Sequence, residues 1–259
     1  MLLALIKADF YQMRSRKSPW VTLTLIVLLT ACATWIAIDF TKQTEPTLFQ
    51  NIANFILFNL PQFVFDPLTI VAIFLAQQLS FNNDNKNRTL INTASYGFSR
   101  NLIFIGKVLT TFLTTLVFFG AILLTLFIML SFLTPHFAIQ DMGSLVTGYV
   151  LPALPIWLAY STLFSILPLL TKSYGLQFLV FILVTNIESI LTVGQLLLGD
   201  QAKSFAWLLE ADWILTRLTP LKPLHYFQLN FNWTWIVALL YVAIFALIGM
   251  TLFKRSEIK

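Results

Sequence analysis

Six long apolar stretches constrain the fold of this chain more than any other feature. They cover residues 20–38, 61–81, 108–133, 148–170, 174–193 and 233–253. Each is close to the roughly 20 residues that a helix needs to cross about 30 Å of hydrocarbon. Because no water inside a bilayer can bond to an exposed backbone amide, such runs form helices there. The sequence therefore predicts an all-α membrane protein with six transmembrane helices.

The overall composition excludes a soluble globular protein. Of the 259 residues, 58% are hydrophobic and only 10% are charged, whereas about a quarter of the residues in an average soluble domain are charged. No internal repeat, low-complexity segment or linker divides the chain. We therefore expect a single membrane domain over residues 1–259.

Lysine and arginine are concentrated on one side of the predicted membrane domain. If the N-terminus is cytoplasmic, the cytoplasmic segments hold 12 of the 16 cations: Lys7, Arg14, Arg16, Lys17, Lys86, Arg88, Arg100, Lys107, Lys172, Lys254, Arg255 and Lys259. The outer segments hold the other four: Lys42, Lys203, Arg217 and Lys222. Cytoplasmic loops usually carry the excess of cations, so both termini are predicted in the cytoplasm. Because the cations are spread along one membrane face and form no base-reading motif, no nucleic-acid partner is expected.

The N-terminal segment, residues 1–17, has the pattern of an amphipathic helix lying at the membrane surface. Its apolar face contains four residues: Leu2, Ile6, Phe10 and Met13. Lys7 and Arg14 lie on another face. Such a helix binds in the interface with its apolar side toward the lipid. It can serve as a platform for a cytoplasmic partner or simply as a basic anchor that sets the topology, and the spacing favours neither.

The polar loop between the second and third spans, residues 82–107, has an unusual number of structural signals. Residues 89–96 read as a short helix, and Gly97 suits the left-handed conformation that ends one. Ser99 is placed to cap the next helix, which begins at Arg100. We therefore expect a short helix, a turn and the start of a membrane helix, packed against the inner membrane face. A solvated linker is the alternative.

This loop resembles the coupling loop of ABC-2 type permeases. The resemblance rests on Asp84-Asn85-Lys86-Asn87-Arg88-Thr89-Leu90, then Ser95-Tyr96-Gly97-Phe98-Ser99-Arg100 and Gly106-Lys107. In that family an acidic residue, a Gly-Thr pair, a short helix, a Ser-Arg pair and a Lys typically follow one another. Arg88 stands in place of the glycine. The resemblance implies that eight residues couple the chain to an ATPase: Asp84, Thr89, Leu90, Tyr96, Gly97, Ser99, Arg100 and Lys107.

The resemblance extends along the chain, because these permeases also have an N-terminal interfacial helix, six spans and a long outer segment before the last span. It implies a separate ABC ATPase subunit that binds ATP and Mg, and a second permease copy or a homologous permease. The chain itself has no phosphate-binding loop, since Asn101 and Val108 occupy positions where that motif needs a glycine and a hydroxyl beside Gly106-Lys107. His136 and His225 are too far apart in the sequence to match the usual spacing of metal ligands. We therefore expect a non-catalytic subunit without a cofactor or a metal of its own.

Polar residues inside the fifth span suggest a transport path. Asn186, Glu188 and Ser189 lie within the stretch 174–193, and a charge within a membrane helix usually faces protein or water. Glu188 is also near the outer end of the span, where its side chain can reach the headgroups instead. Both interpretations stay open.

Two further segments bear on how such a protein works. The fourth span contains Pro152, Pro155 and Pro168, which can create a hinge or can simply pack. The outer segment 194–232 is too apolar for a solvated loop, and its apolar runs are too short to cross the bilayer. We expect interfacial or re-entrant helices there.

Together these features predict a permease subunit in the bacterial cytoplasmic membrane. By resemblance it is an exporter, and the few polar groups in the spans favour an amphipathic or apolar substrate such as a peptide, a drug or a lipid-like molecule. Immunity to an antimicrobial peptide is one role that fits. The alternatives are a secondary transporter without an ATPase and a non-transporting scaffold or sensor.

Overall fold

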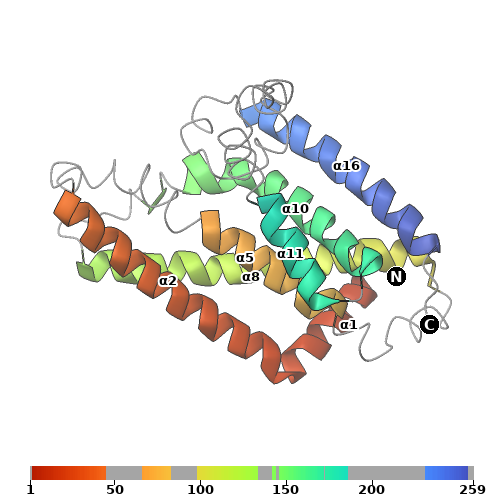
Figure 1. Ribbon diagram of the computed structural model, residues 1–259, viewed down its shortest axis with the longest axis horizontal. Helices are drawn as coiled ribbons and strands as arrows, with labels where there is room; N and C mark the ends of the chain where they lie inside the picture. Colours follow the sequence, from red (N-terminus) through yellow and green to blue (C-terminus); the bar gives the residue numbers. More distant parts are fainter. Residues whose placement is uncertain are drawn as a thin grey trace, which may run out of the picture.

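The described part of the chain is entirely helical. The computed structural model describes residues 2–44, 66–82, 98–133, 142–143, 146–171, 173–185 and 231–255. Its helices are α1 (Leu2–Ser15), α2 (Lys17–Thr44), α5 (Asp66–Gln77), the π-helix η3 (Gln78–Asn82), α8 (Arg100–Leu133), the π-helix η4 (Val146–Val150), α10 (Leu151–Leu170), α11 (Tyr174–Thr185) and α16 (Phe231–Arg255) (Figure 1). The predicted all-α class is confirmed for these residues.

Among the described residues, four helices are long and apolar enough to cross a membrane, as expected of a multi-pass membrane protein. They are Lys17–Phe40, Arg100–Leu133, Leu151–Leu170 and Ala238–Arg255. The second and fifth predicted spans coincide with shorter apolar helices, Leu68–Phe81 and Tyr174–Leu183. These lengths leave the number of six spans a prediction. The predicted loop helix and the outer segment 194–232 lie outside the described residues.

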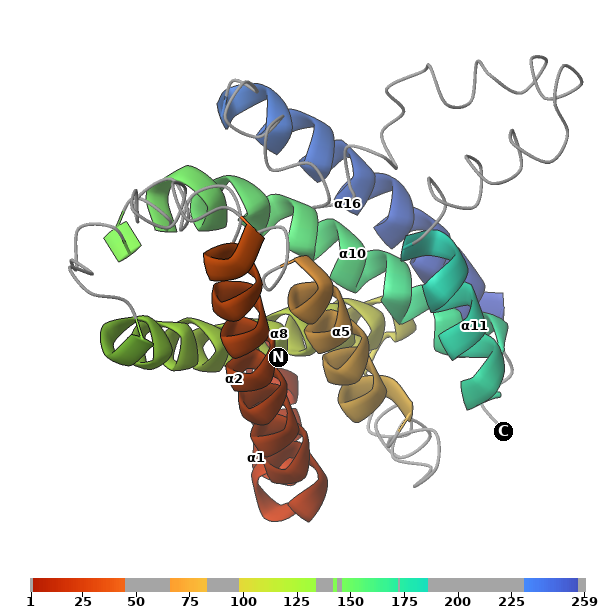
Figure 2. The same ribbon diagram turned by 60° about the vertical axis from the view of Figure 1, so that its left-hand side comes forward.

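Helix α10 is the centre of the bundle. Figures 1 and 2 show it between α16 and α8, and it packs on both. The side chains of Trp157, Tyr160 and Phe164 are almost completely buried. The three prolines, two of them inside the helix, are buried as well, and α10 runs unbroken from Leu151 to Leu170. In this structure the prolines therefore pack in the core and do not divide the helix.

A second apolar cluster joins η3, α8, α10 and α16 at one end of the bundle. It consists of Phe81, Ile103, Phe104, Val108, Ile166 and Phe253. The ring of Phe104 lies 6.2 Å from that of Phe81 and 6.1 Å from that of Phe253, measured between centroids. Gly249 of α16 faces the Phe104 ring so closely that a Cβ atom there would overlap it. The missing side chain therefore lets α16 approach α8.

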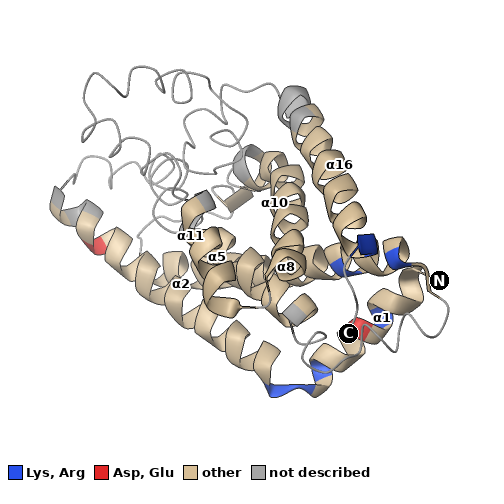
Figure 3. Cartoon of the chain, turned by 45° about the vertical axis from the view of Figure 1, so that its right-hand side comes forward, with Lys and Arg blue, Asp and Glu red and all other residues tan. Residues whose placement is uncertain are grey.

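The charged side chains of the described residues are also distributed unevenly. Figure 3 shows the lysines and arginines gathered at one end of the bundle, around α1, the start of α8 and the end of α16. Asp39 lies near the far end of α2. We refer to the end of the bundle that carries these lysines and arginines as the cationic end.

Candidate functional site

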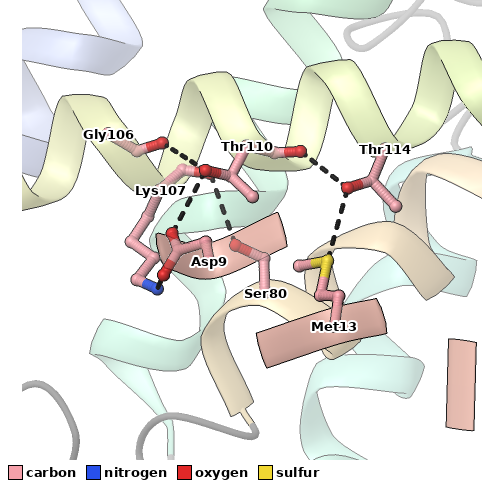
Figure 4. Close-up of polar contacts among 7 residues, drawn as sticks. All are labelled: Asp9, Met13, Ser80, Gly106, Lys107, Thr110 and Thr114. Carbon is pink, nitrogen blue, oxygen red and sulfur yellow. Dashed lines mark hydrogen bonds and ion pairs between the residues drawn. The ribbon is translucent and has the colours of Figure 1, made fainter. Parts of the chain in front are cut away.

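A buried ion pair fastens the N-terminal helix to α8. Lys107 Nζ lies 2.6 Å from Asp9 Oδ1, and the two side chains are only 8% and 14% exposed. The Thr110 hydroxyl lies 3.1 Å from the other carboxylate oxygen, Oδ2, to which it donates (Figure 4). Each oxygen of the Asp9 carboxylate thus has a partner, which a buried charge requires if it is not to destabilise the fold.

Apolar and weakly polar contacts extend this attachment along α1. Thr114 Oγ1 donates to the sulfur of Met13 at 3.7 Å. At the other end of α1, Leu2 and Leu5 lie 3.7–3.8 Å from the position that a Cβ of Gly106 would occupy. The predicted N-terminal helix is therefore confirmed, and Leu2 and Met13 of its predicted apolar face contact α8. Its position on the membrane surface stays a prediction.

The π-helix η3 closes the other side of this junction. Ser80 Oγ donates to the backbone carbonyl of Lys107 at 3.4 Å. The cleft between α1, η3 and α8 is lined by Asp9, Gln12, Met13, Arg16, Leu79, Ser80 and Lys107. The start of α8 is therefore held between the first helix of the chain and the end of the second predicted span.

The first turn of α8 has the cap that the sequence predicted. The amide of Leu102 donates to Ser99 Oγ at 3.4 Å, and that of Ile103 donates to the Ser99 carbonyl at 3.1 Å. Arg100 Nη1 donates to the backbone carbonyl of Lys254 at 2.7 Å. That carbonyl lies in the last turn of α16, where the backbone carbonyls have no partner further along the helix. The bond therefore joins the start of α8 to the end of α16.

A cluster of three glutamines lies between the α5–η3 pair and α11. Gln78 Nε2 donates to Oε1 of both Gln77 and Gln177, at 3.0 Å each. Gln177 Nε2 donates to the carbonyl of Thr171 at 2.8 Å. Gln77 is fully buried, and its Nε2 has no hydrogen-bond partner among the described residues. Interruptions of the π-helix kind are frequent at functional sites, so these amides form a candidate polar site.

The structure brings together only part of the predicted site. Ser99, Arg100 and Lys107 lie in or beside the first two turns of α8. Five other predicted coupling residues lie outside the described residues: Asp84, Thr89, Leu90, Tyr96 and Gly97. The predicted path residues also lie outside them: Asn186, Glu188 and Ser189.

Sequence reasoning missed Asp9 and the glutamines, although both carried a signal. Asp9 is the single acidic residue among residues 1–17 and lies on the helix face that also contains Leu2, Leu5 and Met13. Gln77 and Gln78 interrupt the apolar stretch 61–81. Polar groups in such positions are costly unless they have partners inside the protein. Across the described residues, no three His, Cys, Asp or Glu side chains come together as a metal site.

Comparison with known proteins gives no family for this chain. No protein-family model matches it, and no curated protein matches it. The functional interpretation therefore depends on the loop residues and on the contacts of α8 given above.

Proposed function

We propose that this chain is the membrane-spanning subunit of a bacterial ABC-2 type transporter. In this proposal it crosses the cytoplasmic membrane six times with both termini inside, and it pairs with a second copy or a homologous permease. A separate ATPase binds ATP and Mg²⁺ and supplies the energy. The transported molecule is amphipathic or apolar, of the peptide, drug or lipid-like class, and is exported.

The observation that best supports the proposal is the double attachment of the segment that follows the predicted coupling loop. Within eight residues of α8, Arg100 bonds to the end of α16 and Lys107 pairs with α1. A linker that only connects two spans needs neither contact. A segment that receives force from a partner needs both, because the force must reach helices other than its own.

This attachment suggests how energy would pass into the membrane. When ATP binding moves the ATPase against residues 82–107, the displacement reaches α1, α8 and α16 together. The ATPase can shift the equilibrium between the inward-open and outward-open arrangements only if it binds one of them more tightly. The size of the shift is set by the difference between the two affinities. The bonds of Arg100 and Lys107 are the contacts through which such a difference would act on the bundle.

The proposed path combines predicted and observed polar groups. Asn186, Glu188 and Ser189 remain candidates from the sequence. To them we add Gln77 and Gln177. Gln78 links the buried side-chain amides of these two residues, because its Nε2 donates a hydrogen bond to each. A peptide or lipid-like substrate has carbonyl oxygens that could accept a hydrogen bond from Gln77 Nε2, which has no partner in the described part of the chain.

Co-purification tests the proposal directly. The tagged chain, solubilised in mild detergent from its own host, should bring down an ATPase subunit. A negative charge in the coupling segment, introduced by Tyr96→Glu or Arg100→Glu, should reduce the recovered ATPase and any transport, whereas Lys7→Glu on the exposed side of α1 should not. Membrane insertion of each variant is measured in parallel, because a loss of both insertion and partner would only report misfolding.

The same experiment separates the alternatives. Transport that persists with no ATPase recovered would indicate a secondary transporter. A chain that brings down other proteins, and whose loop variants change no transport, would be a scaffold or a sensor. Either result would contradict the proposal.

A further inference from the structure

The turn between α1 and α2 is a rigid elbow. The Arg16 amide donates to the Met13 carbonyl at 3.2 Å, and Ser15 Oγ donates to the Gln12 carbonyl at 2.9 Å. The Trp20 indole, from the first turn of α2, donates to the carbonyl of Arg14 at 3.4 Å. The last carbonyls of α1 are thus satisfied at the turn itself, and the ion pair with Lys107 fixes the helix on α8. The backbone that carries the outer side chains of this elbow is therefore held in one arrangement.

Three cations lie at the elbow, Arg14, Arg16 and Lys17, and a fourth, Lys7, lies about two turns earlier on α1. Lys7, Arg14 and Lys17 are exposed and Arg16 is half-buried. The only carboxylate of this part of the chain, Asp9, is paired with Lys107, and none of the four cations forms an ion pair with another described residue. The elbow therefore presents a concentrated positive charge that the described part of the protein does not neutralise (Figure 3).

The position of the elbow relative to a bilayer follows from α2. The apolar segment Lys17–Phe40 is long enough to cross the membrane and begins at the elbow. Trp20, 58% exposed, is one turn further in, and Val21, Leu25 and Leu28 continue the exposed apolar surface. Tryptophan is enriched at the level of the headgroups. The cations just before it consequently lie at the depth of the phosphate groups.

We propose that this elbow is a binding surface for the headgroups of anionic phospholipids. The exposed guanidinium and ammonium groups of Arg14 and Lys17 can each pair with a phosphate diester, and Lys7 lies on the same exposed side of α1. Anionic lipids gather at clustered basic residues beside a membrane helix, and salt weakens the attraction. The proposal concerns the lipid around the chain, so it is independent of whether an ATPase binds to the loop.

The elbow can be probed with a single fluorescent label. Cys32 is the chain's one cysteine, so Cys32→Ser followed by Ser18→Cys places a label on an exposed residue of the elbow. The labelled chain is placed in phosphatidylcholine nanodiscs with a trace of quencher-bearing lipid. The quencher is carried either by phosphatidylglycerol or by phosphatidylcholine, and both versions hold it at the same depth.

If anionic lipid is enriched at the elbow, quenching by the phosphatidylglycerol carrier should exceed quenching by the phosphatidylcholine carrier about threefold or more at low salt. The excess should disappear in Arg14→Gln/Lys17→Gln. It should persist in Lys254→Gln/Arg255→Gln, which removes two exposed cations from the same end of the bundle but not from the elbow.

Three results would overturn the proposal. The first is equal quenching by both lipids in the parent protein. The second is an excess that survives loss of Arg14 and Lys17. The third is quenching by either lipid only after a co-purified protein has been removed, which would mean that the cations face an acidic protein surface.

Discussion

At the scale of single residues, the pairing of Asp9 with Lys107 shows why a charge can be retained in so apolar a protein. Each group alone would be an unpaired charge in a nearly dry site, at a cost of several kcal/mol. Together they neutralise one another, and Thr110 satisfies the remaining carboxylate oxygen. The pair thus selects one register of α1 on α8, because a shift of one residue along either helix would separate the charges.

This argument predicts a strongly non-additive pair of substitutions. Lys107→Met should destabilise the protein by about 3 kcal/mol, because it leaves the Asp9 carboxylate buried without a counter-ion. Adding Asp9→Asn should recover part of that loss, so the double variant should unfold at a higher temperature than Lys107→Met alone. Thermal melting in a single detergent measures both.

The control for this cycle is Lys7→Met. Lys7 is an exposed cation on the same helix as Asp9, so the substitution should change the melting temperature little. Additive effects of Asp9→Asn and Lys107→Met would show that the two side chains are not coupled, and would contradict the attachment of α1 described here.

At the scale of helices, hydropathy predicted where apolar segments lie but not how far the helices extend. The apolar stretch of the third span covers residues 108–133, whereas α8 begins at Arg100, as the Ser99 cap predicted, and has 34 residues, or about 51 Å at 1.5 Å per residue. The additional turns begin with Arg100 and Asn101, end with Lys107, and contain the bonds to α1 and α16. Hydropathy reports transfer into lipid, and it therefore gives no information on charged residues whose partners lie on other helices.

Contacts between helices were likewise beyond the sequence. The Ser99 cap was predictable because cap and helix are adjacent in the chain. The pairing of Arg100 with the carbonyl of Lys254 joins residues that are far apart in sequence, and a backbone carbonyl carries no sequence signal at all. The same holds for Gln78 and Gln177, whose contact depends on which face of α11 turns toward η3.

The approach of α16 to α8 gives an element-scale prediction. Gly249→Ala should destabilise the protein by about 1–3 kcal/mol, because the new Cβ overlaps the ring of Phe104, which is fully buried and cannot move aside without repacking. Gly120→Ala is the matched control. Nothing lies within 4 Å of its Cβ position, so alanine there should be neutral or stabilising by up to about 1 kcal/mol.

Thermal melting of the two alanine variants in one detergent provides the comparison. Adding Phe104→Leu to Gly249→Ala should recover part of the loss by removing ring atoms from the overlap. Equal melting temperatures for Gly249→Ala and Gly120→Ala would show that α16 does not pack on α8 as closely as described.

At the scale of the whole molecule, the directions of the four long helices predict return crossings. α2 and α8 both begin at the cationic end (Figure 3), and α10 and α16 both finish there, since Ile166 and Phe253 share one cluster. Because the chain leaves α2 at the far end and enters α8 at the cationic end, we expect it to cross back between them. α5 and η3 lie on that return, because Ser80 bonds to Lys107. By the same reasoning α11 lies between α10 and α16.

Two sandwich fusions of alkaline phosphatase, which is active only outside the cytoplasm, distinguish six crossings from four. With six, an insertion in 83–97 is cytoplasmic and inactive, whereas one in 134–141 is external and active. If only the four long helices crossed, both results would be reversed, because α8 would then begin outside. We expect the six-crossing pattern, since Lys86 and Arg88 add cations to the loop after η3 and cytoplasmic loops carry that excess. A green fluorescent protein insertion at each position gives the complementary readout, bright in 83–97 and dark in 134–141.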